Sequence, residues 1–211
     1  MRWHEECADA KTIAAAERMA EAASGFYLAG GTALALRIGH RISLDLDLFS
    51  RGNALGAAER GAVLRRLEAS GPFKIIESKD GTCHLDLKGV SVSLFHYPCR
   101  LLGRTSAWRG LAVAALEDIA AMKLGAVIGR GSRKDFIDID VLARLRGWDW
   151  LKSAGKRKFP RHADFALQAA KALVYFTDAE KEPMPRLLEA ASWGNLKSRF
   201  EREIPKHFLA S

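Results

Sequence analysis

The strongest pattern in the first half of the chain is a strict alternation of apolar and polar residues over positions 41–49. The apolar members are Ile42, Leu44, Leu46 and Leu48, and the polar members are Arg41, Ser43, Asp45 and Asp47. Such a period of two predicts a strand with one buried face and one polar face. Just before it, FYLAGG reads as a short buried strand that ends in a tight turn, and TALALRIG reads as a short helix opened by Thr32.

The rest of the chain predicts helices and strands in mixed order. Helical patterns cover 8–24, 57–69, a segment from Leu116, and KDFIDIDVLARLRG after the link IGRGSR. Strand patterns are FKIIES, CHLDLK, VSVSLF and a short one near LAVAA, with a hairpin turn at Lys88-Gly89. From Trp148 onward the pattern is helical and polar. We therefore expect an α+β (or α/β) core over 1–146 and a helical C-terminal region over 147–211 packed on that core.

Composition limits the classes of protein that fit. The chain has 211 residues, 48% of them hydrophobic, which is enough to bury a substantial core. It has no apolar run of about 18 residues, so we expect no membrane span. The N-terminus carries acidic residues and lacks the apolar stretch of a secretory signal, so a cytoplasmic location is expected. Three cysteines at unrelated spacings predict neither a disulfide framework nor a CxxC metal site.

The net charge of +8 favours polyanionic partners, such as nucleic acid or nucleotides, over acidic ones. One local basic cluster, KSAGKRKFPRH over 152–162, is interrupted by glycine and proline. Two interpretations of it stay open. It is either a solvated loop or a contact with an RNA or DNA backbone.

Two aspartates in the alternating segment carry the main chemical signal. Side chains at i and i+2 of a strand point to the same side, so Asp45 and Asp47 should project together. Without a counter-ion the two carboxylates repel, whereas a divalent cation such as Mg²⁺ or Mn²⁺ removes that cost. The alternative is an edge strand whose aspartates face water and pair with Arg41 or Arg37, because a lone DxD tripeptide is a weak motif.

The residues Gly30, Gly31 and Thr32 favour the metal interpretation. Two glycines between a strand and a helix let the backbone approach a ligand closely. The amide groups at the helix start and the Thr32 hydroxyl would form an anion site. A phosphate-binding bend followed by a metal-binding acid pair is what phosphoryl or nucleotidyl transfer requires.

The string YLAGGTALALRIGHRISLDLDLF resembles the AbiEii/AbiGii abortive-infection toxin family, within the polymerase-beta-type nucleotidyltransferase superfamily. A second string, LEDIAAMKLGAVIGRGSRKDFIDIDVL over 116–142, is similar to the later motif of that family. The resemblance covers 26–146 and implies a polymerase-beta-like core with a short mixed sheet flanked by helices.

The resemblance also assigns roles to individual residues. Gly30, Gly31 and Thr32 would hold the triphosphate of an NTP, and Asp45 and Asp47 would bind Mg²⁺. The residues lining the approach would be His40, Arg41 and Ser43. In the second motif, Lys123 and Arg130 would face the nucleotide, and the motif would be completed by Lys134, Asp135 and Asp138.

The second motif also has a plain structural interpretation. Lys123 and Arg130 are seven residues apart, so on one helix they share a face and could both reach phosphates. The alternative is a solvated stripe in which these two residues and Asp118 point outward. Similarly, Lys134 and Asp138 are one turn apart and could form only a surface ion pair.

One departure from the superfamily concerns the third carboxylate, which in polymerising members helps to deprotonate the incoming hydroxyl. Its expected place is VSVSLF, where the candidate position is Ser93, a residue without useful basicity. Asp86, in HLDLK on the partner strand, would substitute if its side chain turned toward the site.

We therefore predict a Mg²⁺-dependent nucleotidyltransferase that moves a nucleoside monophosphate from an NTP to a hydroxyl. The resemblance implies an RNA acceptor such as tRNA, a toxin role, and an antitoxin encoded nearby; we expect a monomer. The alternative is a catalytically degenerate nucleotide- or RNA-binding module of the same fold. A third interpretation, a DxD glycosyltransferase that uses UDP-sugars, fits poorly with so short a chain.

Overall fold

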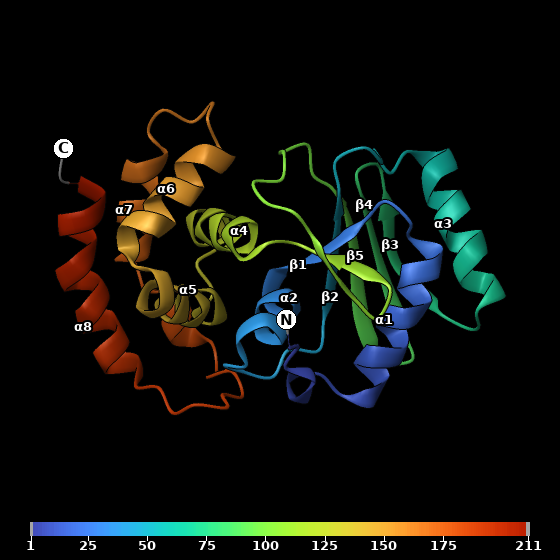
Figure 1. Cartoon of the computed structure of the whole chain (residues 1–211), viewed down its shortest axis with the longest axis horizontal. Helices are drawn as coiled ribbons and strands as arrows, with labels where there is room; N and C mark the ends of the chain where they lie inside the picture. Colours follow the sequence, from blue (N-terminus) through green and yellow to red (C-terminus); the bar gives the residue numbers. More distant parts are fainter. Residues whose placement is uncertain (1, 210–211) are drawn as a thin grey trace. The chain divides into compact units, whose positions relative to one another are not determined.

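A computed structural model describes residues 2–209 of the chain, which form two compact units (Figure 1). Unit 1 comprises Met1–Arg100 and Arg104–Ala115, and unit 2 comprises Leu101–Gly103 and Leu116–Ser211. The division therefore falls at 115/116, whereas the sequence-based boundary lies at 146/147. The reason is non-local packing: α4 (Leu116–Gly129) and α5 (Arg133–Arg146) pack against α6 (Trp148–Lys158), so they group with the C-terminal helices.

Unit 1 is built on one seven-stranded mixed sheet with strand order β3-β4-β5-β2-β1-β7-β6. The strands are β1 (Tyr27–Ala29), β2 (Leu46–Ser50), β3 (Lys74–Lys79), β4 (Thr82–Leu87), β5 (Val90–His96), β6 (Ser106–Trp108) and β7 (Leu111–Val113). The β1/β7 and β2/β5 pairs are parallel, and the other neighbours are antiparallel. The mixed α and β architecture expected from the sequence is confirmed.

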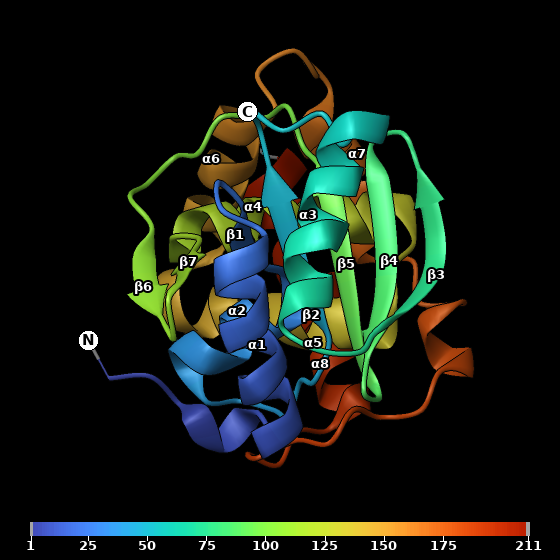
Figure 2. The ribbon, with the colours of Figure 1, turned by 90° about the vertical axis from the view of Figure 1, so that its right-hand side faces the viewer.

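The helices of unit 1 are η1 (Glu5–Cys7), α1 (Ala10–Ala22), α2 (Gly30–Ile38) and α3 (Ala57–Ala69). Figure 2 shows α1 and α3 lying together over one face of the sheet. In β2 the alternation places Leu46 and Leu48 among fully buried residues, and Val92 and Leu94 of β5 are buried beside them. Asp47 of β2 and its partner Ser93 of β5 therefore point to the other face.

Two features of unit 1 can be compared with the sequence patterns. The hairpin turn between β4 and β5 is confirmed, with Lys88 at φ 56° and Gly89 at φ 91°. Two successive positive φ values are typical of a tight two-residue hairpin. The strand expected from Arg41, however, begins only at Leu46, and Leu44 is 41% exposed. Residues 41–45 instead form part of the connection between α2 and β2.

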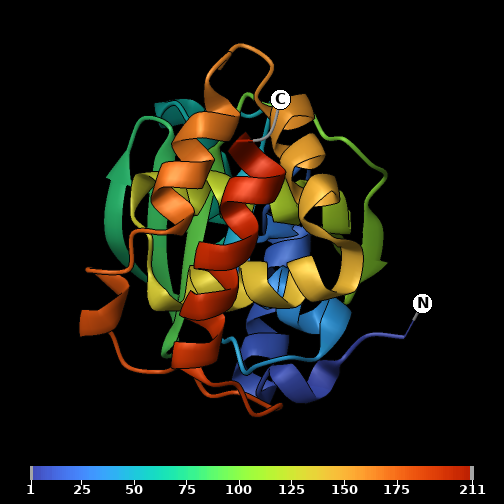
Figure 3. The same cartoon turned by 90° about the vertical axis from the view of Figure 1, so that its left-hand side faces the viewer.

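Unit 2 is helical and contains α4, α5, α6, α7 (Phe165–Leu173), η2 (Ala179–Lys181), α8 (Trp193–Ile204) and the short π-helix η3 (Pro205–Leu209) (Figures 1 and 3). An aromatic cluster forms its core. Phe136 of α5 lies 5.1 Å from Phe176 and 5.8 Å from Phe200 of α8, measured between ring centroids. Trp148 of α6 meets Phe200 edge-on at 5.0 Å.

The basic cluster at 152–162 is mostly helical. Residues 152–158 belong to α6, so the expectation of a solvated loop is wrong for them. Lys158 is 1% exposed, and its Nζ lies 2.7 Å from Oδ1 of the buried Asp118. The long aliphatic stem of a lysine can cross a helix interface when its ammonium group meets a buried carboxylate. Arg157 pairs with Glu117.

Asp118 also holds the short segment Leu101–Gly103, which groups with unit 2. Its carboxylate accepts hydrogen bonds from the backbone N–H groups of Leu102 and Gly103 at 2.9–3.0 Å. These contacts explain why Leu101–Gly103 groups with the helices although the residues on either side belong to unit 1. Within the described residues, no helix combines the length and the apolar character needed to cross a bilayer.

Candidate active site

The strand β1 ends at a glycine pair that opens α2. Gly30 has φ +72°, a backbone conformation that favours glycine. A Cβ placed on Gly30 would lie 2.4 Å from Oδ2 of Asp47, because Ala29 and Asp47 are partners in the antiparallel β1/β2 pair. The Asp47 carboxylate therefore rests directly against the glycine backbone, and any side chain at position 30 would push it away.

Gly31 is covered in the same way by a different group. A Cβ there would lie 2.4 Å from Nη2 of Arg41 and 3.0 Å from Oγ of Ser43. Arg41 is 4% exposed, and its Nη1 donates to the carbonyl oxygen of Ile42 at 3.2 Å. The guanidinium group is therefore held beside the first turn of α2, where the helix dipole and unbonded amide groups favour anions.

Thr32 links the helix to the aspartate pair. Its Oγ1 lies 3.0 Å from Oγ of Ser43 and donates to the backbone carbonyl oxygen of Asp45. Thr32 is 1% exposed, so its hydroxyl is engaged inside the protein. These contacts hold residues 43–45 against α2, which explains why they leave the strand ladder and why the predicted alternation fails there.

The carboxylate of Asp47 thus lies at the glycine bend, whereas Asp45 is tied to α2 through its backbone carbonyl oxygen. Asp45 is exposed and immediately precedes β2, and Asp47 is partly exposed on the strand itself. No cluster of three or more His, Cys, Asp or Glu side chains with metal-binding geometry occurs among residues 2–209. Magnesium is commonly held by one or two carboxylates together with water and substrate phosphates. A pair of carboxylates beside a bend with close backbone access fits that donor set.

His40 and Arg37 line the far end of α2. His40 is 3% exposed, directly after the α2 C-cap Gly39, which has φ +72°. Arg37, which we considered as a partner for the aspartates, donates from Nε to the carbonyl oxygen of Ala114 at 2.7 Å and from Nη2 to that of Val113 at 3.2 Å. These two bonds tie α2 to the end of β7.

The second motif forms a buried ion network in unit 2. Nζ of Lys123 on α4 lies 2.9 Å from Oδ1 of Asp135 and 2.6 Å from Oδ2 of Asp138 on α5. Both aspartate side chains are fully buried, and the Lys123 side chain is 5% exposed. Burial opposes ionisation of Asp135, but the charges of Lys123 and Arg130 outweigh it and lower the pKa of that carboxyl to about 2.

Two more residues complete this network. Arg130 places Nε 3.0 Å from Oδ2 of Asp135, with 60% of its own side chain exposed. The Ser132 hydroxyl donates to the same oxygen at 2.7 Å. Ser132 was missed by the sequence interpretation, although its position three residues before Asp135, at the helix start, is a usual capping signal.

Two sequence-based alternatives for this motif are therefore wrong. Asp118 and Lys123 are 0% and 4% exposed, so they do not form a solvated stripe. The expected Lys134–Asp138 surface pair is replaced by the Lys123–Asp138 pair, since Asp138 points into the helix interface. Lys134 is partly exposed on the first turn of α5.

The place of the third carboxylate can also be inspected. Ser93 of β5, the candidate position for that carboxylate, is the register partner of Asp47. Asp86 pairs with Ser91, and its Oδ1 accepts a hydrogen bond from the N–H of Gly89 in the hairpin turn. The carboxyl of Asp86 therefore stabilises the turn, and the cross-strand partner of Ser93 is His84.

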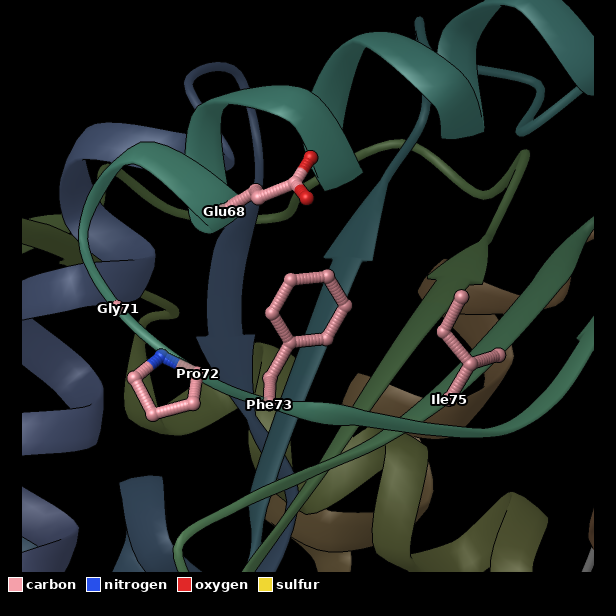
Figure 4. A pocket seen from close by; sticks show the side chains of 5 residues that line it. All are labelled: Glu68, Gly71, Pro72, Phe73 and Ile75. Carbon is pink, nitrogen blue, oxygen red and sulfur yellow. The ribbon is translucent and has the colours of Figure 1, made fainter.

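Each unit contains a concave region lined by other residues. The first has a volume of about 620 Å³ and lies where α3 leads into β3, lined by Glu68, Gly71, Pro72, Phe73 and Ile75 (Figure 4). Only Glu68 among these is ionisable. The second, of about 560 Å³, lies in unit 2 between the end of α4 and α7, and Arg130, Lys171 and Tyr175 contribute to its walls.

Comparison with known proteins places this geometry in a family. Residues 15–107 and 96–210 match the nucleotidyl transferase AbiEii toxin family of type IV TA systems. An uncharacterized protein of Aquifex aeolicus (strain VF5), aq_aa25, is 35% identical over 187 residues, which cover 86% of this chain and 87% of that protein.

Solved structures share the fold at low sequence identity. A putative nucleotidyltransferase from H. pylori has a TM-score of 0.53 at 19% identity, covering 99% of this chain and 96% of that one. MenT4, the nucleotidyltransferase toxin Rv2826c from Mycobacterium tuberculosis H37Rv, has a TM-score of 0.56 at 15% identity, covering 93% and 84% respectively. With an acid pair at a glycine bend and matches along nearly its whole length, the chain belongs to the AbiEii nucleotidyltransferase toxin family and is a nucleotidyltransferase.

Proposed function

We propose that this nucleotidyltransferase moves a nucleoside monophosphate from an NTP to a hydroxyl group on RNA, such as tRNA, in a Mg²⁺-dependent reaction. The observation that carries the proposal is the contact between the Asp47 carboxylate and the Gly30 backbone. It brings the Asp47 carboxylate to the first turn of a helix, where phosphate groups bind, and Asp45 lies two residues before it in the chain.

The residues of unit 1 would have three roles: binding the triphosphate, supporting the glycine bend and binding the metal ion. The backbone of Gly30 and Gly31, the Arg41 guanidinium and the Ser43 hydroxyl would hold the triphosphate, while Thr32 and His40 would keep the bend in shape. Asp45 and Asp47 would hold Mg²⁺, or Mn²⁺ in its place. When bound, such an ion supplies positive charge that neutralises phosphate oxygens as the P–O bonds change.

The second motif supplies cations and holds them in place. Within unit 2, Lys123 would hold the two buried aspartates together, and Arg130, whose side chain is 60% exposed, would present its charge to an anionic ligand. Asp135 and Asp138 fix the Lys123 ammonium through contacts of 2.9 and 2.6 Å. Lys134, on the same helix as the two aspartates, adds a further positive charge.

In the reaction itself, an acceptor hydroxyl oxygen forms a bond to the α-phosphorus while the bond from that phosphorus to the bridging oxygen breaks. Pyrophosphate leaves, and the acceptor loses its proton. Acting in this way on RNA, a monomeric cytoplasmic enzyme would arrest growth until an antitoxin encoded nearby restrained it.

The test is transfer of label from each of four α-³²P-NTPs to total RNA with Mg²⁺ present. The wild type should label RNA, and EDTA or the double variant Asp45→Ala/Asp47→Ala should abolish labelling. Asp80→Ala, which removes a carboxylate 86% exposed elsewhere in unit 1, is the matched control and should leave labelling unchanged.

Ser93 favours a second candidate function, because a serine stands beside Asp47 where a carboxylate is expected. A module that binds nucleotide or RNA without turnover would leave wild type and double variant equally inert with all four NTPs. Equilibrium binding of an NTP to both proteins would then identify the degenerate form.

A further inference from the structure

One straight row of side chains crosses the sheet of unit 1 from the acid pair to its edge. The strands β2, β5, β4 and β3 lie side by side, with β3 outermost (Figure 2). Asp47 is the register partner of Ser93, Ser93 of His84, and His84 of Glu77. Directly paired residues project to the same face of a sheet, so all four side chains share the face that carries Asp47.

A β-bulge in β3 determines that Glu77 is the residue that faces His84. The β3/β4 register shifts between Ile75 and Glu77: Ile75 pairs with Leu85, and Glu77 pairs with His84. Without this register shift, Ile76 would stand opposite His84. Ile76 is instead 68% exposed. Bulges commonly re-aim a side chain near a functional site, and this one brings a carboxylate to the histidine.

Two contacts along the row place a different group at each nitrogen of the His84 imidazole. Nδ1 of His84 lies 2.9 Å from Oγ of Ser93, and Nε2 lies 3.6 Å from Oε2 of Glu77. A carboxylate beside Nε2 favours a proton on that nitrogen, which leaves Nδ1 to accept the Ser93 hydroxyl proton. Further charged groups on this face are Lys79, 2.7 Å from Oε1 of Glu77, Asp86, two residues after His84, and Lys74, the register partner of Asp86.

We propose that Ser93, His84 and Glu77 form a proton relay that replaces the missing third carboxylate. The proposal rests on the nucleotidyl transfer described above. Ser93 Oγ takes the proton of the acceptor hydroxyl as its oxygen bonds to the α-phosphorus, and Ser93 passes its own proton to Nδ1 of His84. Glu77 stabilises the imidazolium cation. The proton later leaves to water, and pyrophosphate carries away the bonding electron pair.

This arrangement assigns distinct tasks to the three residues. Ser93, beside Asp47 and 8% exposed, is the catalytic member because it would touch the acceptor. His84 and Glu77 act through it, as in other sites where a histidine oriented by a carboxylate serves a hydroxyl group. General-base assistance of this kind contributes about 10²–10⁴-fold to a rate.

Kinetics of RNA labelling test the relay. His84→Ala and Ser93→Ala should each lower kcat about 10²-fold or more with the KM for NTP unchanged, because neither residue holds the triphosphate. Added imidazole should partly restore His84→Ala but not Ser93→Ala. Glu77→Gln should cause a smaller loss. His96→Ala, a histidine at the exposed end of β5, is the matched control and should keep wild-type kcat.

A second measurement does not depend on turnover. Long-range ¹H–¹⁵N spectra of the intact protein should show His84 as the Nε2–H tautomer, and Glu77→Gln should weaken that preference. An Nδ1–H tautomer overturns the relay.

The kinetic outcomes separate the two proposals. If His84→Ala transfers label at the wild-type rate while Asp45→Ala/Asp47→Ala does not, the relay is overturned and the transferase proposal stands. If the wild type itself transfers nothing, the proposed function falls, and the relay falls with it whatever the tautomer.

Discussion

The two units use aspartate pairs in opposite ways. In unit 1, Asp45 is exposed and Asp47 partly exposed, and the Asp47 carboxylate lies against the backbone of Gly30. In unit 2, Asp135 and Asp138 are completely buried and share one lysine ammonium. A buried carboxylate needs an internal cation at all times, whereas an exposed pair can take its cation from solution. The buried carboxylates of unit 2 therefore stabilise its fold, whereas the carboxylates of Asp45 and Asp47 in unit 1 are available to bind a cation.

The largest expected effect is on catalysis through unit 1. Asp47→Asn should lower RNA labelling about 10³-fold or more, because metal-based charge stabilisation amounts to several kcal/mol. Its free energy of unfolding should change by only about 0.5 kcal/mol, since the side chain is not buried. Urea unfolding beside the labelling assay measures both. A large loss of stability would contradict the contrast between the units.

The next effect is on the stability of unit 2. Lys123→Met leaves two buried carboxylates without their shared ammonium and should lower the free energy of unfolding by about 3–5 kcal/mol. Lys134→Met, on the partly exposed side of α5, is the control and should change it by about 0.5 kcal/mol at most. Chemical denaturation followed by circular dichroism decides between them, and equal effects would show that the network does not stabilise the unit.

A pH titration of stability sharpens the same contrast. The folded-state pKa of Asp135, about 2, lies below its ordinary value of 3.8. The ionised carboxyl therefore stabilises the fold above about pH 4, and this contribution, about 2 kcal/mol, is lost as the pH falls toward 2. Asp135→Asn should show a correspondingly shallower loss of unfolding free energy over that range. Identical pH slopes for the two proteins would exclude this linkage.

The smallest effect concerns the glycine bend. Gly30→Ala should cost about 1–2 kcal/mol for the positive φ. It should also lower transfer activity, because the new Cβ displaces the Asp47 carboxylate. At Gly52, where a Cβ would meet nothing within 4 Å, alanine should be tolerated in both assays. Thermal unfolding and initial rates give the comparison.

The sequence predicted the parts of the site that depend on local pattern. The glycine bend, the core of β2 and the Lys88-Gly89 turn follow from periodicity and from residues that tolerate positive φ. The inward positions of Lys123 and Lys158 could not be predicted in this way. A lysine on a helix is normally exposed, and its buried partner lies 12 or 40 residues away in sequence.

The row across the sheet was missed for a related reason. The pairing of His84 with Glu77 depends on a bulge at Ile76. A register shift of one residue moves every side chain of a strand to the opposite face of the sheet, and alternation alone does not indicate where such a shift occurs. Arg41 was assigned to the polar face of a strand, but its guanidinium packs on Gly31, a contact that alternation cannot indicate.

The short loop held by Asp118 has a practical consequence for dissecting the protein. Leu101–Gly103 belongs to the helical unit, but the residues after it form β6 and β7 of the sheet. Neither unit is therefore encoded by an uninterrupted stretch of the gene. A gene fragment stopping at codon 115 would contain Leu102 and Gly103 without the Asp118 carboxylate that accepts their N–H groups. The complementary fragment would keep Asp118 and Lys158 but lose those amide donors. To express the units separately, the gene would have to be circularly permuted, or a linker would have to replace Leu101–Gly103.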